Sequence, residues 1–310
     1  MPKRLDARFL RRRGRPSRVL RAAVSGLAAL CIAGAASAQE RVEVASPEAL
    51  LEFFENLDYT PEAWQAGIRE VPRVYLMDVG EHWKVNSQNI EVIQKKRIFF
   101  RTLGPLVLRA NEKILADRER LLALQAKDDA GGEDATWLTK LAQRYKVEGA
   151  DAVALAELVK RVDAVPPSLV LAQGAEESGW GTSRFAAEGN ALFGQWTWGG
   201  KGIKPKEQRE ELGDYRIAAF DAPLESVDAY LLNINTNDAY AGLRERRATT
   251  REKNAPVSGW ELAETLTSYS ERGREYVDSL HAIMRVNKLR PTDDAILADG
   301  QEWQIYPAGK

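Results

Sequence analysis

The sequence has very few of the side chains that metal and thiol chemistry use. Its 310 residues include one cysteine, Cys31, and two histidines, His82 and His281, which stand far apart. Neither histidine has a second His or Cys at the spacing of a zinc site, and no His-x-x-x-His helix occurs. The Gly-x-Ser-x-Gly turn of serine hydrolases is also absent. We therefore expect no metal centre and no cofactor, and both of these hydrolase classes are disfavoured.

The N-terminus has the three parts of a secretory signal peptide. A basic stretch over residues 3–21 is followed by an apolar run over residues 22–36 and by the small-residue triplet Ala36-Ser37-Ala38. The apolar run is shorter than the roughly 20 residues that a membrane span needs. We expect cleavage after Ala38, which leaves no stable membrane anchor and predicts an exported protein, with the periplasm as the preferred location.

Removal of residues 1–38 makes the chain acidic. The full sequence has 44 basic and 45 acidic residues, and the signal peptide contains nine of the basic residues and one of the acidic ones. The 35 basic and 44 acidic residues that remain give a net charge of −9. Nucleic acid is therefore not an expected partner, because proteins that bind it present a basic face. Cys31 leaves with the signal peptide, so the mature chain depends on a packed core rather than on disulfides.

Helical periodicity dominates the pattern of apolar residues. From residue 90 to about residue 126 these residues recur at three- and four-residue spacing, which predicts a long amphipathic helix, bent near Gly104-Pro105. Ser46 and Pro47 predict the start of an earlier helix. Residues 71–76 favour an extended connector. No pattern in the tail, residues 291–310, predicts an element.

The amino-acid composition of the chain changes at two places. Residues 127–134 are polar and contain a Gly pair, which predicts a loop and a boundary. Residues 196–220 combine a Gly-rich turn with one predicted strand, which favours a small β-hairpin within a helical domain. We expect four parts: the signal peptide, a helical N-terminal region over residues 39–135, a mainly α domain over residues 136–290, and the tail.

Two adjacent glutamates end a predicted apolar helix. This helix covers residues 169–177 and is followed by Gly179-Trp180-Gly181. The helix dipole disfavours carboxylates at this end, and an adjacent tryptophan provides apolar surroundings that raise a carboxyl pKa. A glutamic acid kept protonated near neutral pH can protonate a leaving oxygen, as glycosidases require. The residues alone leave Glu176 and Glu177 equivalent, and both also fit ordinary exposed helix-end glutamates.

The glutamates belong to a series of motifs in a fixed order. Residues 169–185 read LVLAQGAEESGWGTSRF, and GNALFGQW (189–196), NINTNDAY (233–240) and YSERGREY (269–276) follow. Together they resemble the glucosaminidase family of flagellar muramidases and autolysins, which is glycoside hydrolase family 73, and more closely its Bax-like branch. The resemblance covers roughly residues 136–288.

The resemblance implies a fold and an activity. It implies a lysozyme-like α+β domain, with helices around a cleft and a small β lobe, that hydrolyses β-1,4 bonds of peptidoglycan glycan strands as an N-acetylglucosaminidase. The family's general acid is the glutamate before Ser-Gly-Trp-Gly, which implies this role for Glu177. The family also places tyrosines of the last two motifs near the cleft, which implies a catalytic role for Tyr269 and substrate binding by Tyr240. Gly174 and Ala191 depart from the pattern, where Ala and Asn are expected.

The group that activates water is not fixed by the sequence. The resemblance places a second carboxylate on the β lobe, where Glu207 and Glu210 are the main candidates and Glu211 and Asp214 the others. An inverting enzyme needs roughly 6.5–9.5 Å between the two carboxyl groups. Alternatively, the acetamido group of the substrate assists. Each of these acids also fits a solvated loop charge.

Several residues of the motifs are expected to contact the sugar rings. Trp180, Trp196 and Trp198 offer flat faces to sugars, although aromatic side chains are as often part of a core. We expect Asn190 and Phe193 to bind substrate as well.

Two rival functions stay open on the sequence. One is a non-catalytic protein that binds the cell wall or acts as a scaffold. The other is a nucleotide-binding regulator, because Gly194, Gly199, Gly200 and Lys201 superficially resemble a phosphate loop. The lysine stands one position late and Gly202 replaces the required Ser or Thr, so that match is weak. The sequence does not identify a protein partner.

Overall fold

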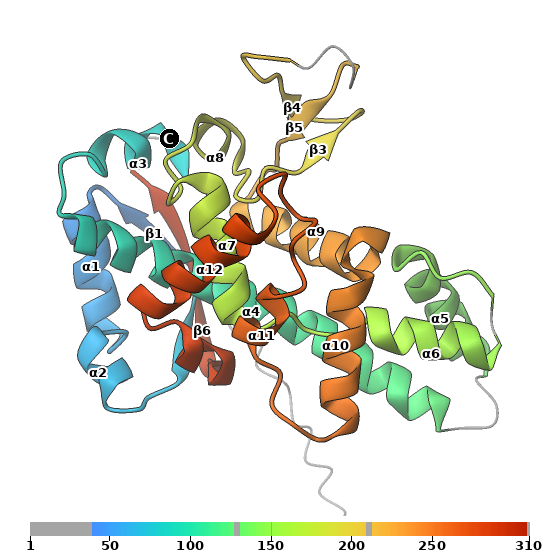
Figure 1. The fold of residues 1–310 in the computed structure, drawn as a ribbon. Helices are drawn as coiled ribbons and strands as arrows, with labels where there is room; N and C mark the ends of the chain where they lie inside the picture. Colours follow the sequence, from blue (N-terminus) through green and yellow to red (C-terminus); the bar gives the residue numbers. More distant parts are fainter. Residues whose placement is uncertain (1–38, 127–130, 150, 209–212, 309–310) are drawn as a thin grey trace, which may run out of the picture. The chain divides into compact units, whose positions relative to one another are not determined.

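Helices packed around one long central helix form most of the protein (Figure 1). The computed structural model describes residues 39–126, 131–149, 151–208 and 213–308, which belong to one compact unit. The predicted signal peptide and the candidates Glu210 and Glu211 lie outside the described residues. The helices are α1 (Pro47–Asn56), α2 (Pro61–Gln65), α3 (Gly80–Asn86), α4 (Val92–Gln125), α5 (Gly132–Arg144), α6 (Ala152–Arg161), α7 (Pro167–Ser178), α8 (Arg184–Gly189), α9 (Pro223–Thr236), α10 (Ala241–Glu252), α11 (Gly259–Ala263) and α12 (Arg274–Val286), with the 3-10 turns η2 (Asp238–Tyr240) and η3 (Arg290–Asp294).

The predicted long helix is confirmed as α4. Gly104 and Pro105 lie inside this helix without ending it. Its apolar stripe is buried in the main hydrophobic core together with residues of α7, α9 and α12. Helix α1 also begins as predicted, because the hydroxyl of Ser46 accepts a hydrogen bond from the backbone N–H of Ala49 at 3.2 Å. Among the described residues no helix is long and apolar enough to cross a membrane.

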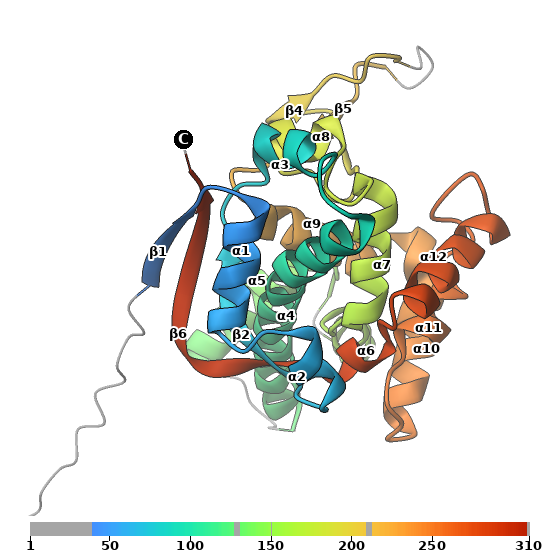
Figure 2. The same cartoon turned by 90° about the vertical axis from the view of Figure 1, so that its left-hand side faces the viewer.

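A parallel sheet of three strands joins the N-terminal region to the tail. Strand β6 (Ile296–Pro307) lies between β1 (Gln39–Val44) and β2 (Glu70–Leu76), as Figure 2 shows. Residues 71–76 are extended, but as a paired strand rather than a connector, and the tail without a recognised pattern supplies the middle strand. The strand was missed because its partners in the sheet lie more than 200 residues away in sequence.

The β lobe projects beside the end of α7 (Figure 1). It consists of β3 (Trp196–Thr197), β4 (Gly202–Ile203) and β5 (Arg216–Ala218), which pair antiparallel in the order β3-β5-β4. The predicted hairpin is therefore part of a three-stranded sheet. The predicted mainly α class with a small β lobe is confirmed, and the region before residue 136 adds two strands to its helices.

Helix α7, which carries the two glutamates, packs closely against α4, and hydrogen bonds fix its first turn. A Cβ atom added to Gly174 would lie 2.6 Å from a methyl group of Leu103 in α4, so a larger residue here would have to displace that side chain. At the other end of the helix, the Asp293 carboxylate accepts hydrogen bonds from the N–H and hydroxyl of Ser168, at 2.9 Å each, and from the N–H of Gly259 at 3.0 Å. Asp293 therefore serves as an N-cap for α7, supplied from the tail.

We expect Asp293→Ala to lower the free energy of unfolding by about 2 kcal/mol, because three partly buried donors lose their acceptor. Urea denaturation followed by circular dichroism measures this change. Asp294→Ala is the matched control, because the adjacent carboxylate is exposed. Equal midpoints for the two variants would show that the cap contributes nothing.

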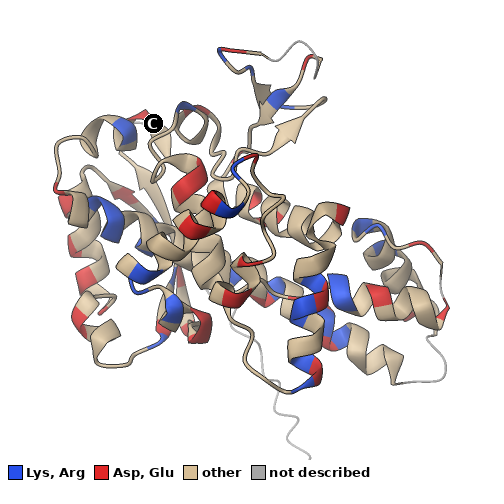
Figure 3. Ribbon diagram, in the orientation of Figure 1, with Lys and Arg blue, Asp and Glu red and all other residues tan. Residues whose placement is uncertain are grey.

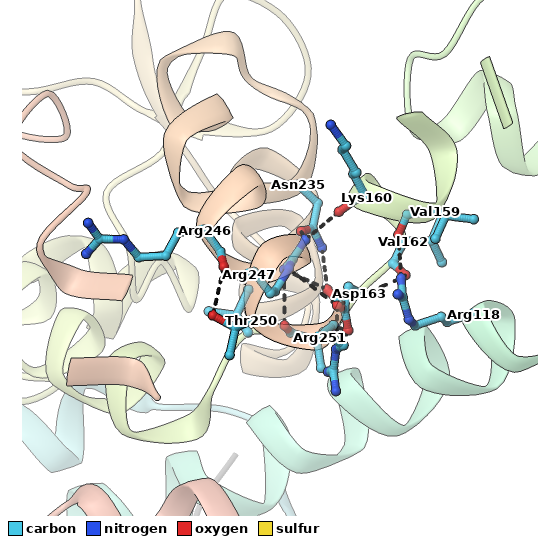
Figure 4. A network of polar contacts seen from close by, with 12 residues as sticks. Arg118, Val159, Lys160, Val162, Asp163, Asn235, Arg246, Arg247, Thr250 and Arg251 are labelled. Carbon is cyan, nitrogen blue, oxygen red and sulfur yellow. Dashed lines mark hydrogen bonds and ion pairs between the residues drawn. The ribbon is translucent and has the colours of Figure 1, made fainter. Parts of the chain in front are cut away.

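A buried charge cluster fixes the chain where it enters α7 (Figure 4). Asp163, with 2% of its side chain exposed, binds Arg251 through both carboxylate oxygens at 2.8 Å. Arg247 is completely buried and lies 3.6 Å from the same carboxylate, while Arg118 lies at 3.8 Å. The two arginines also donate to backbone carbonyls of residues 159–164. One carboxylate therefore ties α4, α10 and the segment before α7 together.

Candidate active site

The turn after the two glutamates has an unusual backbone. Gly179, Trp180 and Gly181 all have left-handed backbone angles, with φ of 56°, 62° and 76°. Glycine adopts them freely, but a tryptophan in this region is strained. Two contacts hold the turn: the hydroxyl of Ser178 accepts from the N–H of Gly181 at 2.8 Å, and the indole of Trp83 donates to the carbonyl of Trp180 at 3.0 Å. The N-terminal region, through α3, therefore supports the turn that follows Glu177.

The carboxyl group of Glu177 is largely buried and has two different oxygens. Oε1 accepts a hydrogen bond from the hydroxyl of Tyr276 in α12 at 2.8 Å. Oε2 has no hydrogen-bond partner among the described residues and lies on the side of Gly194, where an added Cβ atom would stand 4.0 Å away. Burial raises the pKa of Glu177 above that of an ordinary glutamate, and the bond from Tyr276 opposes this rise.

Glu176 lies in a different environment from its neighbour. Its carboxylate forms an ion pair of 2.7 Å with Arg272, from the loop before α12. In Figure 3 this contact brings an acidic segment at the end of α7 next to a basic one. The two charges act on Glu177 in opposite directions, since Glu176 raises its pKa and Arg272 lowers it. The structure thus separates two glutamates that the residues alone leave equivalent.

Tyrosine rings surround the buried side of Glu177. The rings of Tyr269 and Tyr276 stack at 5.2 Å with an angle of 7°, and Tyr240 lies 5.6 Å from Tyr269. Burial raises the pKa of both Tyr269 and Tyr240, and the nearby charge of Glu177 adds to this rise. Both predicted tyrosines therefore lie near the glutamate, but the hydrogen bond to it comes from Tyr276.

Comparison with known proteins identifies the family of this chain. The model of the glucosaminidase family, described as mannosyl-glycoprotein endo-beta-N-acetylglucosaminidase, matches residues 153–289. Protein bax of Escherichia coli (strain K12) is 32% identical over 197 residues, which are 63% of this chain and 70% of that protein. The chain belongs to the glucosaminidase family. The catalytic domain of the autolysin Auto from Listeria monocytogenes is 18% identical, with a TM-score of 0.33 over 57% of this chain and 96% of that chain, a likeness too weak for further conclusions.

Three residues of the glucosaminidase motifs that were predicted to bind substrate have packing roles in the structure. The ring of Trp180 packs edge-on against Phe99 and Phe100 of α4, at 5.7 and 5.3 Å. The buried amide of Asn190 accepts from the N–H of Val79 at 2.8 Å and donates to the carbonyls of Phe220 and Asp221.

Phe193, the third of these residues, is 2% exposed and stacks on Tyr230 at 4.1 Å. Its ring belongs to the main core, whereas that of Trp180 is only partly buried and lies against α4. The three side chains have packing and backbone contacts in the structure, and their contact with sugar stays a prediction.

The β lobe carries the exposed aromatic residues of the site region. Trp196 and Trp198 are 46% and 66% exposed, and the ring of Trp196 lies 4.7 Å from that of Tyr215. Among the candidates for the second carboxylate, Glu207 is exposed. Asp214 lies 3.5 Å from Lys204 and 3.6 Å from Arg216, and its hydrogen bond with Gln208 and these cations lower its pKa. Nothing in the geometry of the described residues selects one of these acids.

Sequence reasoning missed Tyr276, which donates to Glu177, and the two residues that bond in series behind it. Tyr276 ends the last motif, seven positions after Tyr269, and the motif alone does not show which tyrosine reaches the carboxyl group. Gln173 bonds to Tyr276 at 3.0 Å and is itself bonded by Tyr230. One signal was available: Gln173 stands four residues before Glu177, so both project from one face of α7.

Proposed function

We propose that this protein is a peptidoglycan hydrolase of the N-acetylglucosaminidase type, with Glu177 as its general acid. The observation that carries the proposal is the state of this side chain in a glucosaminidase family member: its carboxyl group is buried, its pKa is raised, and Oε2 has no partner within the described residues. Those are the properties of an acid that protonates a glycosidic oxygen.

The proposed reaction starts with proton transfer from Glu177 to the oxygen between two sugars. The bond from that oxygen to the anomeric carbon breaks, its electron pair stays on the oxygen, and a water oxygen bonds to the anomeric carbon. One of the two protons of this water passes to a second carboxylate, and the other stays on the new sugar hydroxyl. In the substrate-assisted alternative, the acetamido oxygen first bonds to the anomeric carbon, and water then displaces it while the carboxylate of Glu177 takes up one water proton. Tyr276 and Tyr269 form the wall behind Glu177, and Trp196 and Trp198 offer faces for sugar rings.

The protein is proposed to act outside the cytoplasm, where peptidoglycan lies. The signal peptide predicted over residues 1–38 supports export, and cleavage after Ala38 would release the chain into the periplasm. N-terminal sequencing of protein recovered from the periplasm tests this step. A mature N-terminus at Gln39 is expected, whereas full-length chain retained in the cytoplasm would contradict it.

Incubation with dye-labelled cell-wall sacculi tests the activity. Release of soluble dye measures cleavage, and protein that sediments with the sacculi measures binding. We expect dye release, whereas binding without release would favour the rival function of a wall-binding or scaffold protein.

The pH dependence of this activity should reflect the raised pKa of Glu177. Only the protonated form donates a proton, so kcat/KM falls as the pH rises through this pKa. We expect this fall to lie above the ordinary carboxyl range, which is near pH 4.3 for glutamate. Rates measured between about pH 4 and pH 9 locate it. A fall centred on the ordinary glutamate pKa would contradict the effect of burial.

A further inference from the structure

A chain of buried hydrogen bonds leads from α9 through α7 to Glu177. The hydroxyl of Tyr230 donates to Oε1 of Gln173, the amide nitrogen of Gln173 donates to the hydroxyl of Tyr276 at 3.0 Å, and this hydroxyl donates to Oε1 of Glu177 at 2.8 Å. Tyr230, Gln173 and Tyr276 are at most 1% exposed. Water therefore cannot replace a lost partner in this chain without entering the core.

The direction of the chain is set by the amide of Gln173. Its nitrogen can only donate, so Tyr276 uses a lone pair towards Gln173 and its single hydrogen towards Glu177. Oε1 of Glu177 is thereby an acceptor in both protonation states. A proton on the carboxyl group then resides on Oε2, the oxygen on the side of Gly194.

Tyr230 in turn fixes the orientation of the amide. If the amide were rotated by half a turn, its oxygen would take the hydrogen of Tyr276, and Glu177 would be satisfied only by placing its own proton on Oε1. The hydrogen of Tyr230 would then have no acceptor among the described residues, which is costly in a core. The observed orientation satisfies every member.

We propose that Gln173 and Tyr230 are positioning residues that keep the acid proton of Glu177 on Oε2. The proposal rests on the proposed general-acid role of Glu177. Neither residue touches the substrate in this account; they act through Tyr276. The β lobe and the sugar then meet a carboxyl group whose proton already faces them, and no rotation of the group precedes the transfer.

Titration of the Glu177 carboxyl group in substrate-free protein tests this proposal. Protein with carbon-13 in its glutamate carboxyl groups is titrated by NMR, and the signal absent from Glu177→Gln identifies the residue. Tyr276→Phe removes the donor to Oε1 and raises the midpoint. Tyr230→Phe removes only the distant hydroxyl, so the amide of Gln173 is free to rotate when Glu177 is protonated. This variant raises the midpoint by a smaller amount than Tyr276→Phe does.

Tyr240→Phe is the matched control for the titration. Tyr240 also lies near Glu177, and its hydroxyl interacts with Asn233, outside the chain. We expect no change in the midpoint for this variant. The ion pair of Glu176 with Arg272 and the ring of Tyr269 also face Glu177, and all three variants leave them in place.

Kinetics give the second readout. In Tyr230→Phe the proton spends part of its time on Oε1, so kcat falls by about 10-fold and the alkaline fall of kcat/KM moves up with the midpoint. Thermal denaturation confirms that each variant is folded. If Tyr230→Phe does not fold, Gln173→Met takes its place, because it interrupts the hydrogen-bond chain at its centre. We expect the same upward shift of the titration midpoint for this variant.

An unchanged midpoint in a folded Tyr230→Phe or Gln173→Met variant would overturn the proposal, as would an equal shift in Tyr240→Phe. Its failure differs from that of the proposed function. Full activity of Glu177→Gln would refute the role of Glu177 as general acid. Titration of Glu177 in proteins that retain this residue would still report on the hydrogen-bond chain.

Discussion

Glu177→Gln lowers the rate of glycan release by about 10²–10⁴-fold, the usual contribution of a general acid. The amide has nearly the shape of the carboxyl group, and its oxygen can still accept the hydrogen bond from Tyr276. What is lost is the proton that the leaving oxygen needs. Dye release from labelled sacculi measures the rate, and thermal denaturation shows that the fold is unchanged.

Glu176→Gln is the matched control for this prediction. It makes the same chemical change one residue earlier and removes a partly exposed ion pair with Arg272. Such pairs contribute little, so we expect the rate to stay within a factor of about three. A reversed result, with a large loss for Glu176→Gln and a small one for Glu177→Gln, would reassign the acid to the neighbour.

Asp163→Asn lowers the free energy of unfolding by about 3–5 kcal/mol, because it removes the anion from a buried cluster of cations. Arg247 is completely buried, and burial already lowers its pKa to about 10 despite the attraction of Asp163. Without that charge, Arg118 and Arg251 face Arg247 with no carboxylate to offset their repulsion (Figure 4). Urea denaturation measures the loss.

Asp221→Asn provides the comparison for Asp163→Asn. Asp221 pairs with Lys201, but more than two thirds of both side chains is exposed, so its removal is expected to change the unfolding midpoint very little. Equal midpoints for the two variants would show that burial of the Asp163 cluster does not matter for stability.

Much of the helical part of the fold was predictable because its signals are local. The three- and four-residue spacing of apolar residues gave α4, and Ser46-Pro47 gave the start of α1. The strand β6 was not predictable in this way, since its pairing depends on β1 and β2 at the other end of the chain. Such pairing is a tertiary property, and residues 296–307 show no clear alternation of buried and exposed side chains.

In the candidate site, too, the local features were predictable from the sequence and the tertiary contacts were not. The apolar helix and its end at Gly179 and Gly181 could be predicted from the sequence, because a helix C-terminus and its glycines are local features. The register of the family motif, rather than local chemistry, distinguished Glu177 from Glu176. The structure adds a physical difference, since Glu176 pairs with Arg272 and Glu177 accepts from Tyr276.

Packing gives other site residues structural roles that the sequence did not predict. Trp180 follows Glu177 closely in sequence, yet its backbone is left-handed and its ring packs against Phe99 and Phe100. Asn190 uses its amide to join three backbone groups. A sequence motif records that such residues recur near a cleft, but it does not show which way a side chain points.

Mass spectrometry of the fragments released from purified peptidoglycan tests whether Glu177 is the acid of an N-acetylglucosaminidase. We expect the wild-type protein to produce glycan fragments with N-acetylglucosamine at each new reducing end, and Glu177→Gln to produce almost none. Muramic acid or an anhydro sugar at the new ends would contradict the assigned bond. Sacculi that bind the protein and yield no fragments at all would contradict the assignment of Glu177 as the acid of a glycan hydrolase.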